Sequence, residues 1–127
     1  VKVHQVEEHK MKEELYTITP ENSKTINKAF VEKRRIIGVG TSVTRALESA
    51  FINDRVSEGT RWTGLFIYPG YHYKVINTLI TNFHLPRSTP LMLAAAFAGK
   101  DFLFKAYYEA IREGYRFYSF GDAMFIQ

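Results

Sequence analysis

Residues 79–89, LITNFHLPRST, limit the possible fold more than any other stretch of this chain. The stretch begins with an apolar and β-branched run, which is typical of a buried strand. The chain then turns polar and brings together three residues that can donate hydrogen bonds or exchange protons: Asn82, His84 and Arg87. Pro86 has a fixed φ and disfavours helix at Leu85, so these residues belong to a stiff turn.

A helix is predicted directly after this turn. Ser88 and Thr89 are good N-cap residues, and Pro90 suits the first turn of a helix from Pro90 to Ala98. Open α/β sheets place ligands where a strand ends in a turn before a helix, and free N–H groups at a helix N-terminus favour anions. An ordinary strand–loop–helix joint without a ligand explains the same residues equally well, so both interpretations stay open.

Strands and helices alternate along the rest of the chain. Strands are predicted at residues 1–6, 15–18, 35–40, 64–68, 71–84, 115–119 and 123–126, and helices at residues 20–33, 41–51, 90–98 and 102–113. A polar loop is expected at 53–63, with helix caps at Thr19, at Thr41 or Ser42, and at Asp101. The alternation predicts an α/β fold with a mostly parallel sheet flanked by helices, and 127 residues suffice for one domain with a real core.

A second strand–glycine–helix turn ends RRIIGVG at Gly40. Such turns can hold a phosphate or a carboxylate, but this one lacks the third glycine of a dinucleotide fingerprint and the GKS/T of a P-loop. Arg45 and Glu48 follow it, three residues apart on the predicted helix. At that spacing we expect them to pair on the helix surface.

The segment EEHKMKEE, residues 7–14, is dense in ionisable groups. In a helix, His9 and Glu13 would share a face, as metal ligands or an acid–base pair would. A solvated connection between two strands is the more common alternative. The sequence has no HExxH or comparable spacing and no cysteine, so no metal site is predicted. Tyr107 and Tyr108 are expected to be core or rim residues.

Composition narrows the class of protein further. The net charge of +4 is compatible with a polyanionic partner such as nucleic acid, and the absence of cysteine fits a reducing compartment. The sequence has no apolar run long enough to span a bilayer and no secretory signal pattern, so a cytoplasmic location is expected. Val1 is not a natural start, and we expect the chain to be a piece of something longer.

Six motifs identify a known family, and they occur in that family's order: EEHKM, VGTSVTRALES, FIYPGY, TNFHLPRST, AFAG and YRFYSFGDAM. In these motifs the chain closely resembles the S-adenosylmethionine:tRNA ribosyltransferase-isomerase family of queuosine biosynthesis. The resemblance covers nearly the whole chain. It implies that residues 1–127 correspond to the C-terminal part of a larger two-domain enzyme.

The resemblance implies an unusual transfer reaction. The family uses S-adenosylmethionine as a ribosyl donor to a 7-aminomethyl-7-deazaguanine base in tRNA. The ribosyl unit is rearranged to give epoxyqueuosine, and adenine and methionine leave. S-Adenosylmethionine would then be a substrate, with no tightly bound cofactor expected, and tRNA would be the partner. No membrane partner is expected, and no feature of the sequence favours a particular oligomeric state.

The resemblance also implies roles for residues in the motifs. Proton transfer or charge stabilisation would fall to His84, His9, Glu14 and Asp122. Binding of a carboxylate or phosphate would fall to Arg45, Arg87 and Arg116, and stacking on a base to Tyr68 and Tyr115. The remaining expected substrate-binding residues are Glu48, Asn82, Ser88 and Thr89.

The chain departs from the family pattern at two motifs. Where the family reads HxMHxE, Lys12 replaces the second histidine; where it reads GTTSVRTLE, the hydroxyls lie at Ser42 and Thr44. Pro90 also replaces a usual leucine. Two other functions stay open: a catalytically incomplete tRNA-binding fragment or degenerate relative, and an ordinary α/β enzyme that binds a phosphorylated small molecule at Gly40 and Ser88.

Overall fold

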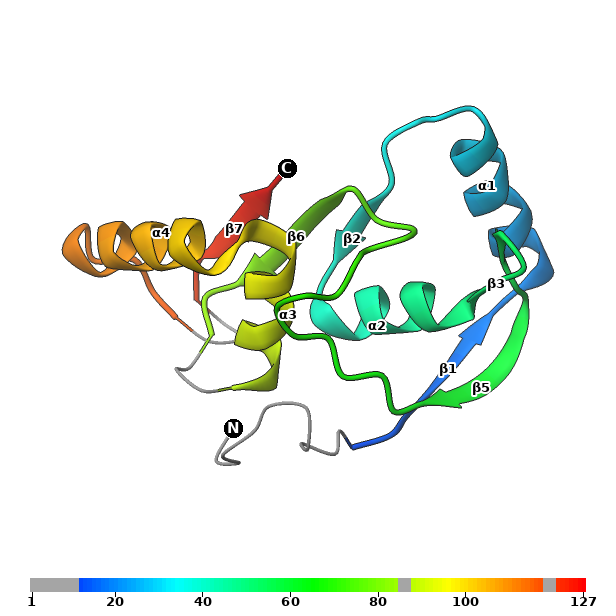
Figure 1. Ribbon diagram of the computed structural model, residues 1–127, viewed down its shortest axis with the longest axis horizontal. Helices are drawn as coiled ribbons and strands as arrows, with labels where there is room; N and C mark the ends of the chain where they lie inside the picture. The colour runs from blue at the N-terminus through cyan, green and yellow to red at the C-terminus, as the bar shows by residue number, and fades with distance from the viewer. Residues whose placement is uncertain (1–11, 85–87, 118–120) are drawn as a thin grey trace.

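A computed structural model of the protein describes residues 12–84, 88–117 and 121–127 (Figure 1). Its strands are β1 (Glu14–Ile18), β2 (Ile37–Val39), β3 (Phe51–Ile52), β4 (Arg55–Val56), β5 (Gly59–Thr63), β6 (Thr78–Asn82) and β7 (Ala123–Ile126). Its helices are α1 (Pro20–Val31), α2 (Thr41–Ala50), α3 (Thr89–Ala98) and α4 (Lys100–Arg112). In the described ranges, no helix combines the length and the apolar character needed to cross a membrane.

The strands form three small sheets, and in the described part of the chain only β2 and β6 pair in parallel. β7 pairs antiparallel with the other side of β6, β1 pairs antiparallel with β5, and β3 with β4. The expectation of a mostly parallel sheet is therefore wrong, although the mixture of helices and strands is confirmed. For β3 and β4 the reason lies in their connection, because the short turn at Asn53 and Asp54 permits only an antiparallel hairpin.

The middle of the chain also differs from the expected strands. The predicted polar loop at 53–63 contains β4 and β5, whereas residues 64–68 form no strand and 71–84 contribute only β6. β5 gains its order from pairing with β1, in which Trp62 lies opposite Leu15. Such pairing joins distant segments, so a short polar strand gives no local signal.

The helices follow their local signals more closely. Thr19 Oγ1 accepts from the N–H of Asn22 at 3.1 Å and Ser88 Oγ from that of Leu91 at 3.3 Å, so both expected caps are confirmed. The caps expected at Thr41 or Ser42 and at Asp101 are wrong. Both helices begin directly after a glycine with positive φ, Gly40 at 91° and Gly99 at 89°, and neither has a side-chain cap.

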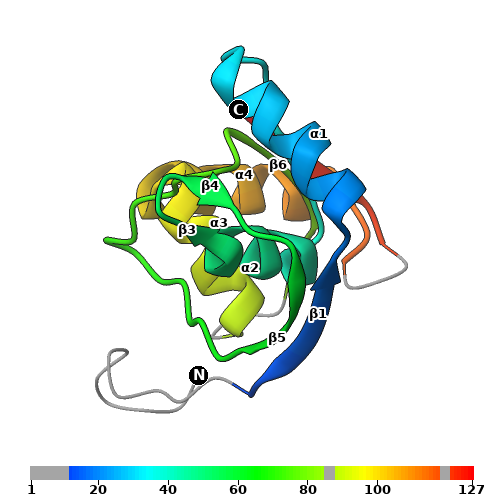
Figure 2. The ribbon, with the colours of Figure 1, turned by 90° about the vertical axis from the view of Figure 1, so that its right-hand side faces the viewer.

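Helix α2 lies at the centre of the molecule, as Figures 1 and 2 show. It contacts β2 on one side and β3, β4 and β5 on the other. Helix α3 is packed as its apolar sequence predicts, with Leu93 and Ala94 at most 2% exposed, and it contacts β6 and α4. This placement leaves α2 little solvent-facing surface, so its charged residues Arg45 and Glu48 are buried.

Candidate functional site

Polar residues gather at one edge of the three-stranded sheet, where β2 and β6 end and β7 begins. β2 leads through Gly40 into α2, β6 ends at Asn82 and is followed by His84, and Asp122 directly precedes β7. The N-termini of α2 and α3 meet here, because Thr41 and Thr89 line the same cavity of about 20 Å³. We call this region the carboxyl edge, because the parallel strands end there and α/β sheets bind ligands there. It comprises six residues: Gly40, Thr41, Asn82, His84, Thr89 and Asp122.

His84 is the most chemically versatile group at the carboxyl edge. Its Nε2 lies 2.7 Å from Thr81 Oγ1, and its backbone N–H donates to the Tyr107 hydroxyl at 2.8 Å. Burial lowers the pKa of His84 below its ordinary value of 6.5. The imidazole is therefore mainly neutral at neutral pH, and a neutral ring can both donate and accept a hydrogen bond.

Asp122 is engaged with the turn that precedes it. Its carboxylate accepts the backbone N–H of Arg116 at 2.7 Å, and the Arg116 guanidinium lies 3.6 Å away. The backbone hydrogen bond from Arg116 is the main reason that the pKa of Asp122 is lowered, with the guanidinium contributing less. Asn82 Nδ2 lies 3.4 Å from the carbonyl oxygens of Gly121 and Asp122. Asp122, Arg116 and Asn82 are thus brought together.

Aromatic rings pack beneath His84. The Phe83 ring contacts the rings of Tyr107, Tyr115 and Phe117 at centroid distances of 5.1, 6.0 and 5.0 Å. Tyr107 is buried, as expected for a core residue, whereas Tyr108 is exposed. Tyr115 stays half exposed beside this cluster, while Tyr68 is half-buried with its ring 5.1 Å from that of Phe66. Tyr115 therefore keeps a ring surface available for stacking.

Arg45 does not lie on the surface of α2, so the expected surface pair with Glu48 is wrong. Arg45 and Glu48 are each only 3% exposed. The Arg45 guanidinium donates to the carbonyl oxygens of Leu65 at 2.9 Å, Lys12 at 3.1 Å and Thr63 at 3.2 Å, and to the Glu14 carboxylate. The guanidinium fork thus ties α2 to one end of the β1–β5 ribbon, where Glu14 is paired with Thr63.

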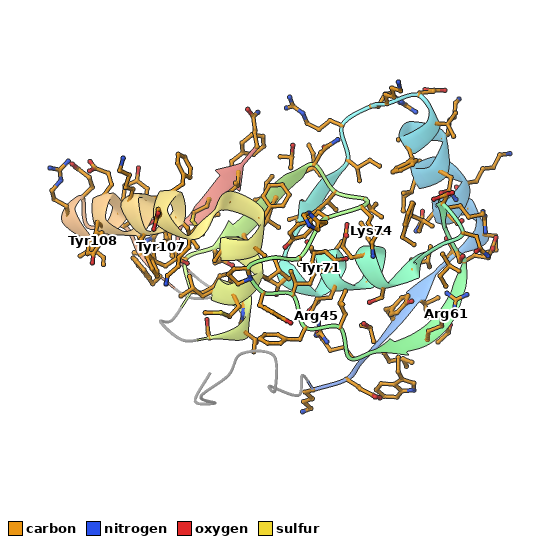
Figure 3. All side chains as sticks on the ribbon, in the orientation of Figure 1. Arg45, Arg61, Tyr71, Lys74, Tyr107 and Tyr108 are labelled. Carbon is orange, nitrogen blue, oxygen red and sulfur yellow. The ribbon has the colours of Figure 1, made fainter. Side chains whose placement is uncertain are left out.

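Glu48 extends to a different segment, the one that precedes β6. Its carboxylate accepts backbone N–H groups from Lys74 at 2.8 Å, Val75 at 2.8 Å and Ile76 at 3.1 Å, and the Tyr71 hydroxyl at 2.9 Å. Tyr71 and Lys74 lie close together in Figure 3, with the ammonium 5.5 Å from the ring centroid. Burial, reinforced by the charge of Glu48, raises the pKa of Tyr71. Glu48 therefore satisfies backbone groups that have no strand partner.

The hydroxyl residues of the α2 turn have their own partners. Ser42 Oγ donates to Glu14 at 3.0 Å, so Glu14 is shared between Ser42 and Arg45. Thr44 Oγ1 donates to the carbonyl oxygen of Gly40 at 2.9 Å. A Cβ at Gly38 would lie only 2.8 Å from Thr44 Oγ1, so the position of this hydroxyl depends on the glycine. The hydroxyls of Ser42 and Thr44, whose positions differ from the family pattern, thus stabilise β1 and the turn before α2.

Several predicted residues take positions of other kinds. Ser88 caps α3, and Thr89 lies at its first turn beside α2. His9 and Arg87 lie outside the described residues. Within the described ranges, no group of three or more His, Cys, Asp or Glu residues is placed to hold a metal ion.

Sequence reasoning missed Thr81 and Tyr107 as partners of His84. Thr81 precedes His84 by three residues, but residues at that spacing in a strand point to opposite faces. They meet only because β6 ends at Asn82. Tyr107 is 23 residues away on α4, so no local pattern could have revealed it.

The larger hollows lie beside other elements. One of about 600 Å³ lies between α4 and β7, one of about 590 Å³ lies beside α1, and one of about 460 Å³ lies between β1, α1 and α2. Glu14 and Ser42 border the third, but His84 lines none of these three. The six residues of the carboxyl edge are all partly exposed, and none of the three larger hollows contains His84.

The fold and the carboxyl edge define a mixed α/β domain with a candidate ligand-binding site at the ends of two parallel strands. Residues 1–126 match the family described as queuosine biosynthesis protein, and the chain belongs to that family. This confirms the relationship inferred from the motifs.

Named relatives agree with the family match. The chain is 55% identical over 127 residues to the S-adenosylmethionine:tRNA ribosyltransferase-isomerase of Moorella thermoacetica, covering 99% of this chain and 37% of that protein. The protein of the same name from Heliobacterium modesticaldum is also 55% identical, over 128 residues, with the same coverage. The crystal structure of S-adenosylmethionine tRNA ribosyltransferase from Thermotoga maritima is similar with a TM-score of 0.84 at 47% identity, covering 89% of this chain and 40% of that one. The chain thus spans just over a third of the length of these curated relatives.

Proposed function

We propose that this chain is part of an S-adenosylmethionine:tRNA ribosyltransferase-isomerase and supplies one side of its active site. The observation that carries the proposal is the match of 99% of the chain, at 55% identity, to a relative of that name. The gathering of motif residues at the carboxyl edge supports the same conclusion. A cytoplasmic location follows if tRNA is the substrate.

In the proposed reaction, the ribosyl unit of S-adenosylmethionine is transferred to 7-aminomethyl-7-deazaguanine in tRNA and rearranged to form epoxyqueuosine, while adenine and methionine leave. His84 and Tyr115 would face the substrates, since the first is a partly exposed neutral imidazole and the second has a half-exposed ring. The contacts of Asn82, Asp122 and Arg116 would hold together the end of β6, the start of β7 and the residue that follows Tyr115.

The buried charges of α2 would act indirectly. Arg45 binds backbone carbonyl oxygens and Glu14 of β1, and Glu48 accepts backbone N–H groups, so their role would be to hold the segments around the site. His9, Arg87, Ser88, Thr89 and Tyr68 remain proposed site residues on the family resemblance alone.

A catalytically incomplete tRNA-binding fragment is the second candidate. It is favoured by the coverage of only 37% of the Moorella relative and by Lys12 in place of the family's histidine. In this case the chain would bind tRNA but would not support adenine release, even when it is joined to the remainder of that relative.

Adenine release distinguishes the two candidates. We would mix the chain with S-adenosylmethionine and tRNA carrying the aminomethyl base, and follow adenine by chromatography. In parallel, we would test the Moorella relative with its matching segment replaced by this chain. Release by the chain alone supports a complete site. Release only by the chimera supports the proposed function, with one side of the site supplied by this chain. Release by neither protein, with tRNA still bound, supports the incomplete fragment.

A matched pair of substitutions in the chimera connects activity to the carboxyl edge. His84→Ala should lower the rate by about 100-fold, the usual loss when one oriented hydrogen-bonding or proton-transfer group is removed. His72→Ala is the control, because His72 is an exposed histidine away from the carboxyl edge and should leave the rate unchanged. A folded chimera that releases no adenine with tRNA present would refute the proposed function.

A further inference from the structure

The environment of the Thr81 hydroxyl restricts the protonation of His84. Thr81 is only 5% exposed, so its hydroxyl has little access to water. Its Oγ1 lies 2.7 Å from His84 Nε2, and this is its single side-chain hydrogen bond within residues 12–84, 88–117 and 121–127. The hydrogen-bonding needs of the Thr81 hydroxyl therefore have to be met by His84 Nε2.

Two neutral tautomers of His84 are possible, and they treat this hydroxyl differently. If Nε2 carried the proton, it would donate to Oγ1, and the hydroxyl proton would be left without an acceptor. If Nε2 is bare, the hydroxyl donates to it and both groups are satisfied. A buried donor left unpaired is costly, whereas a hydroxyl oxygen with a spare lone pair is common, so the second arrangement is favoured. The ring proton then lies on Nδ1.

The rest of the His84 environment is consistent with a neutral ring that carries one proton. Burial lowers its pKa, and none of the ion pairs of the described residues includes His84. The Tyr107 hydroxyl accepts the backbone N–H of His84 and so fixes the residue without using its ring. Nδ1 has no hydrogen-bond partner among the described residues.

We infer that Thr81 is a positioning residue that holds His84 in the tautomer with its proton on Nδ1, so that His84 offers the substrate a hydrogen-bond donor instead of a base. The first half stands on the contact alone, and the second half rests on the proposed function. The group that His84 addresses would be an acceptor, such as a carboxylate or phosphate oxygen or a purine ring nitrogen. Removal of a proton from the ribosyl donor would then fall to a different residue.

Nitrogen-15 NMR of the chain tests the tautomer without any need for activity. In histidine-labelled protein at neutral pH, His84 should show a protonated Nδ1 and an unprotonated Nε2, with its signals assigned by their loss in His84→Asn. A proton on Nε2, or signals averaged between the two tautomers, would overturn the inference.

Variants of Thr81 test its part in this. Thr81→Val keeps the shape and removes the hydroxyl, so the His84 signals should move towards the average of the two tautomers. Thr81→Ser restores a hydroxyl and should restore the Nδ1 proton. If Thr81→Val keeps the wild-type tautomer, Thr81 does not position the ring. The Ser variant and the wild type still decide the tautomer if the Val variant does not fold.

The donor role is tested by activity in the chimera. Asparagine can place its amide N–H near the position of Nδ1, whereas glutamine places its amide near that of Nε2, and neither can act as a base. We expect His84→Asn to release adenine at least about ten times faster than His84→Gln. Equal loss in both variants would overturn the donor role. A wild-type chimera without activity would refute the proposed function, and the tautomer would then be judged by NMR alone.

Discussion

The two charges of α2 and the polar groups of the carboxyl edge both come from motif residues, yet they have opposite surroundings. Arg45 and Glu48 are each 3% exposed and each makes four hydrogen bonds to other segments. His84 is half-buried, and its ring has one partner among the described residues. Residues of the same family motifs can thus have either of two roles. Those whose polar atoms are all paired with other segments hold the site, and those with unused hydrogen-bonding atoms can face a ligand.

Glu48→Ala should have the largest effect on stability. It would leave the buried N–H groups of Val75 and Ile76 without an acceptor, so the free energy of unfolding should fall by about 3 to 5 kcal/mol. Urea denaturation measures this. Glu48→Gln keeps one carbonyl oxygen and should lose less. A loss below about 1 kcal/mol for the Ala variant would mean that Glu48 does not hold this segment.

Arg45→Lys should have the next largest effect. One ammonium cannot reach four oxygens spread over Lys12, Glu14, Thr63 and Leu65, so we expect a loss of about 2 to 3 kcal/mol. Arg61→Lys is the matched control, because Arg61 reaches only the nearby carbonyl oxygens of Ser57 and Glu58. Equal midpoints of urea unfolding for the two variants would remove the distinction between the buried and the peripheral arginine.

How far the sequence predicts this molecule depends on the range of the interaction. The helix caps Thr19 and Ser88 each bind a residue three positions further along the chain, and the sequence predicts both caps correctly. The pairing of β1 with β5 joins segments that have no common local pattern, and β5 was predicted as a loop.

The site divides in the same way. The sequence predicts the polar turn at His84 correctly, but the spacing of Arg45 and Glu48 wrongly predicts a surface pair. That prediction assumes that residues three apart pair on an exposed helix surface. It fails here because α2 is covered on both sides. Burial of that helix is a tertiary property, so the direction of each charge could not be read from its spacing.

His84→Ala should change stability less than either α2 substitution. The ring makes one described hydrogen bond, so we expect a loss of about 1 kcal/mol, which reflects the Thr81 hydroxyl left unpaired. A loss as large as that of Glu48→Ala would make His84 a structural residue and would weaken its proposed contact with substrate.

The same histidine should add a pH dependence. Because burial lowers its pKa in the folded chain, the unfolded chain binds the proton at higher pH. The free energy of unfolding should therefore decrease as the pH falls below 6.5, and should level off below the pKa of the folded chain. In His84→Asn this component should be missing when urea unfolding is compared at several pH values. Identical pH profiles would contradict the lowered pKa.

Lys12→His should have the smallest effect. Arg45 contacts the backbone oxygen of Lys12, and the Lys12 side chain is exposed, so stability should stay within about 0.5 kcal/mol. The substitution restores the histidine of the family motif. A large stability change would show that this position acts through its side chain and not only through its carbonyl group.

The Glu48 carboxylate has a consequence for the motions of the chain. Lys74, Val75 and Ile76 lie in a segment without helix or strand, where backbone amides normally exchange with solvent deuterium within the dead time of an experiment. Here three consecutive amides donate to one buried side chain of another element. Their exchange should require α2 and this segment to separate, so an irregular loop should show the slow exchange usually reserved for a central strand.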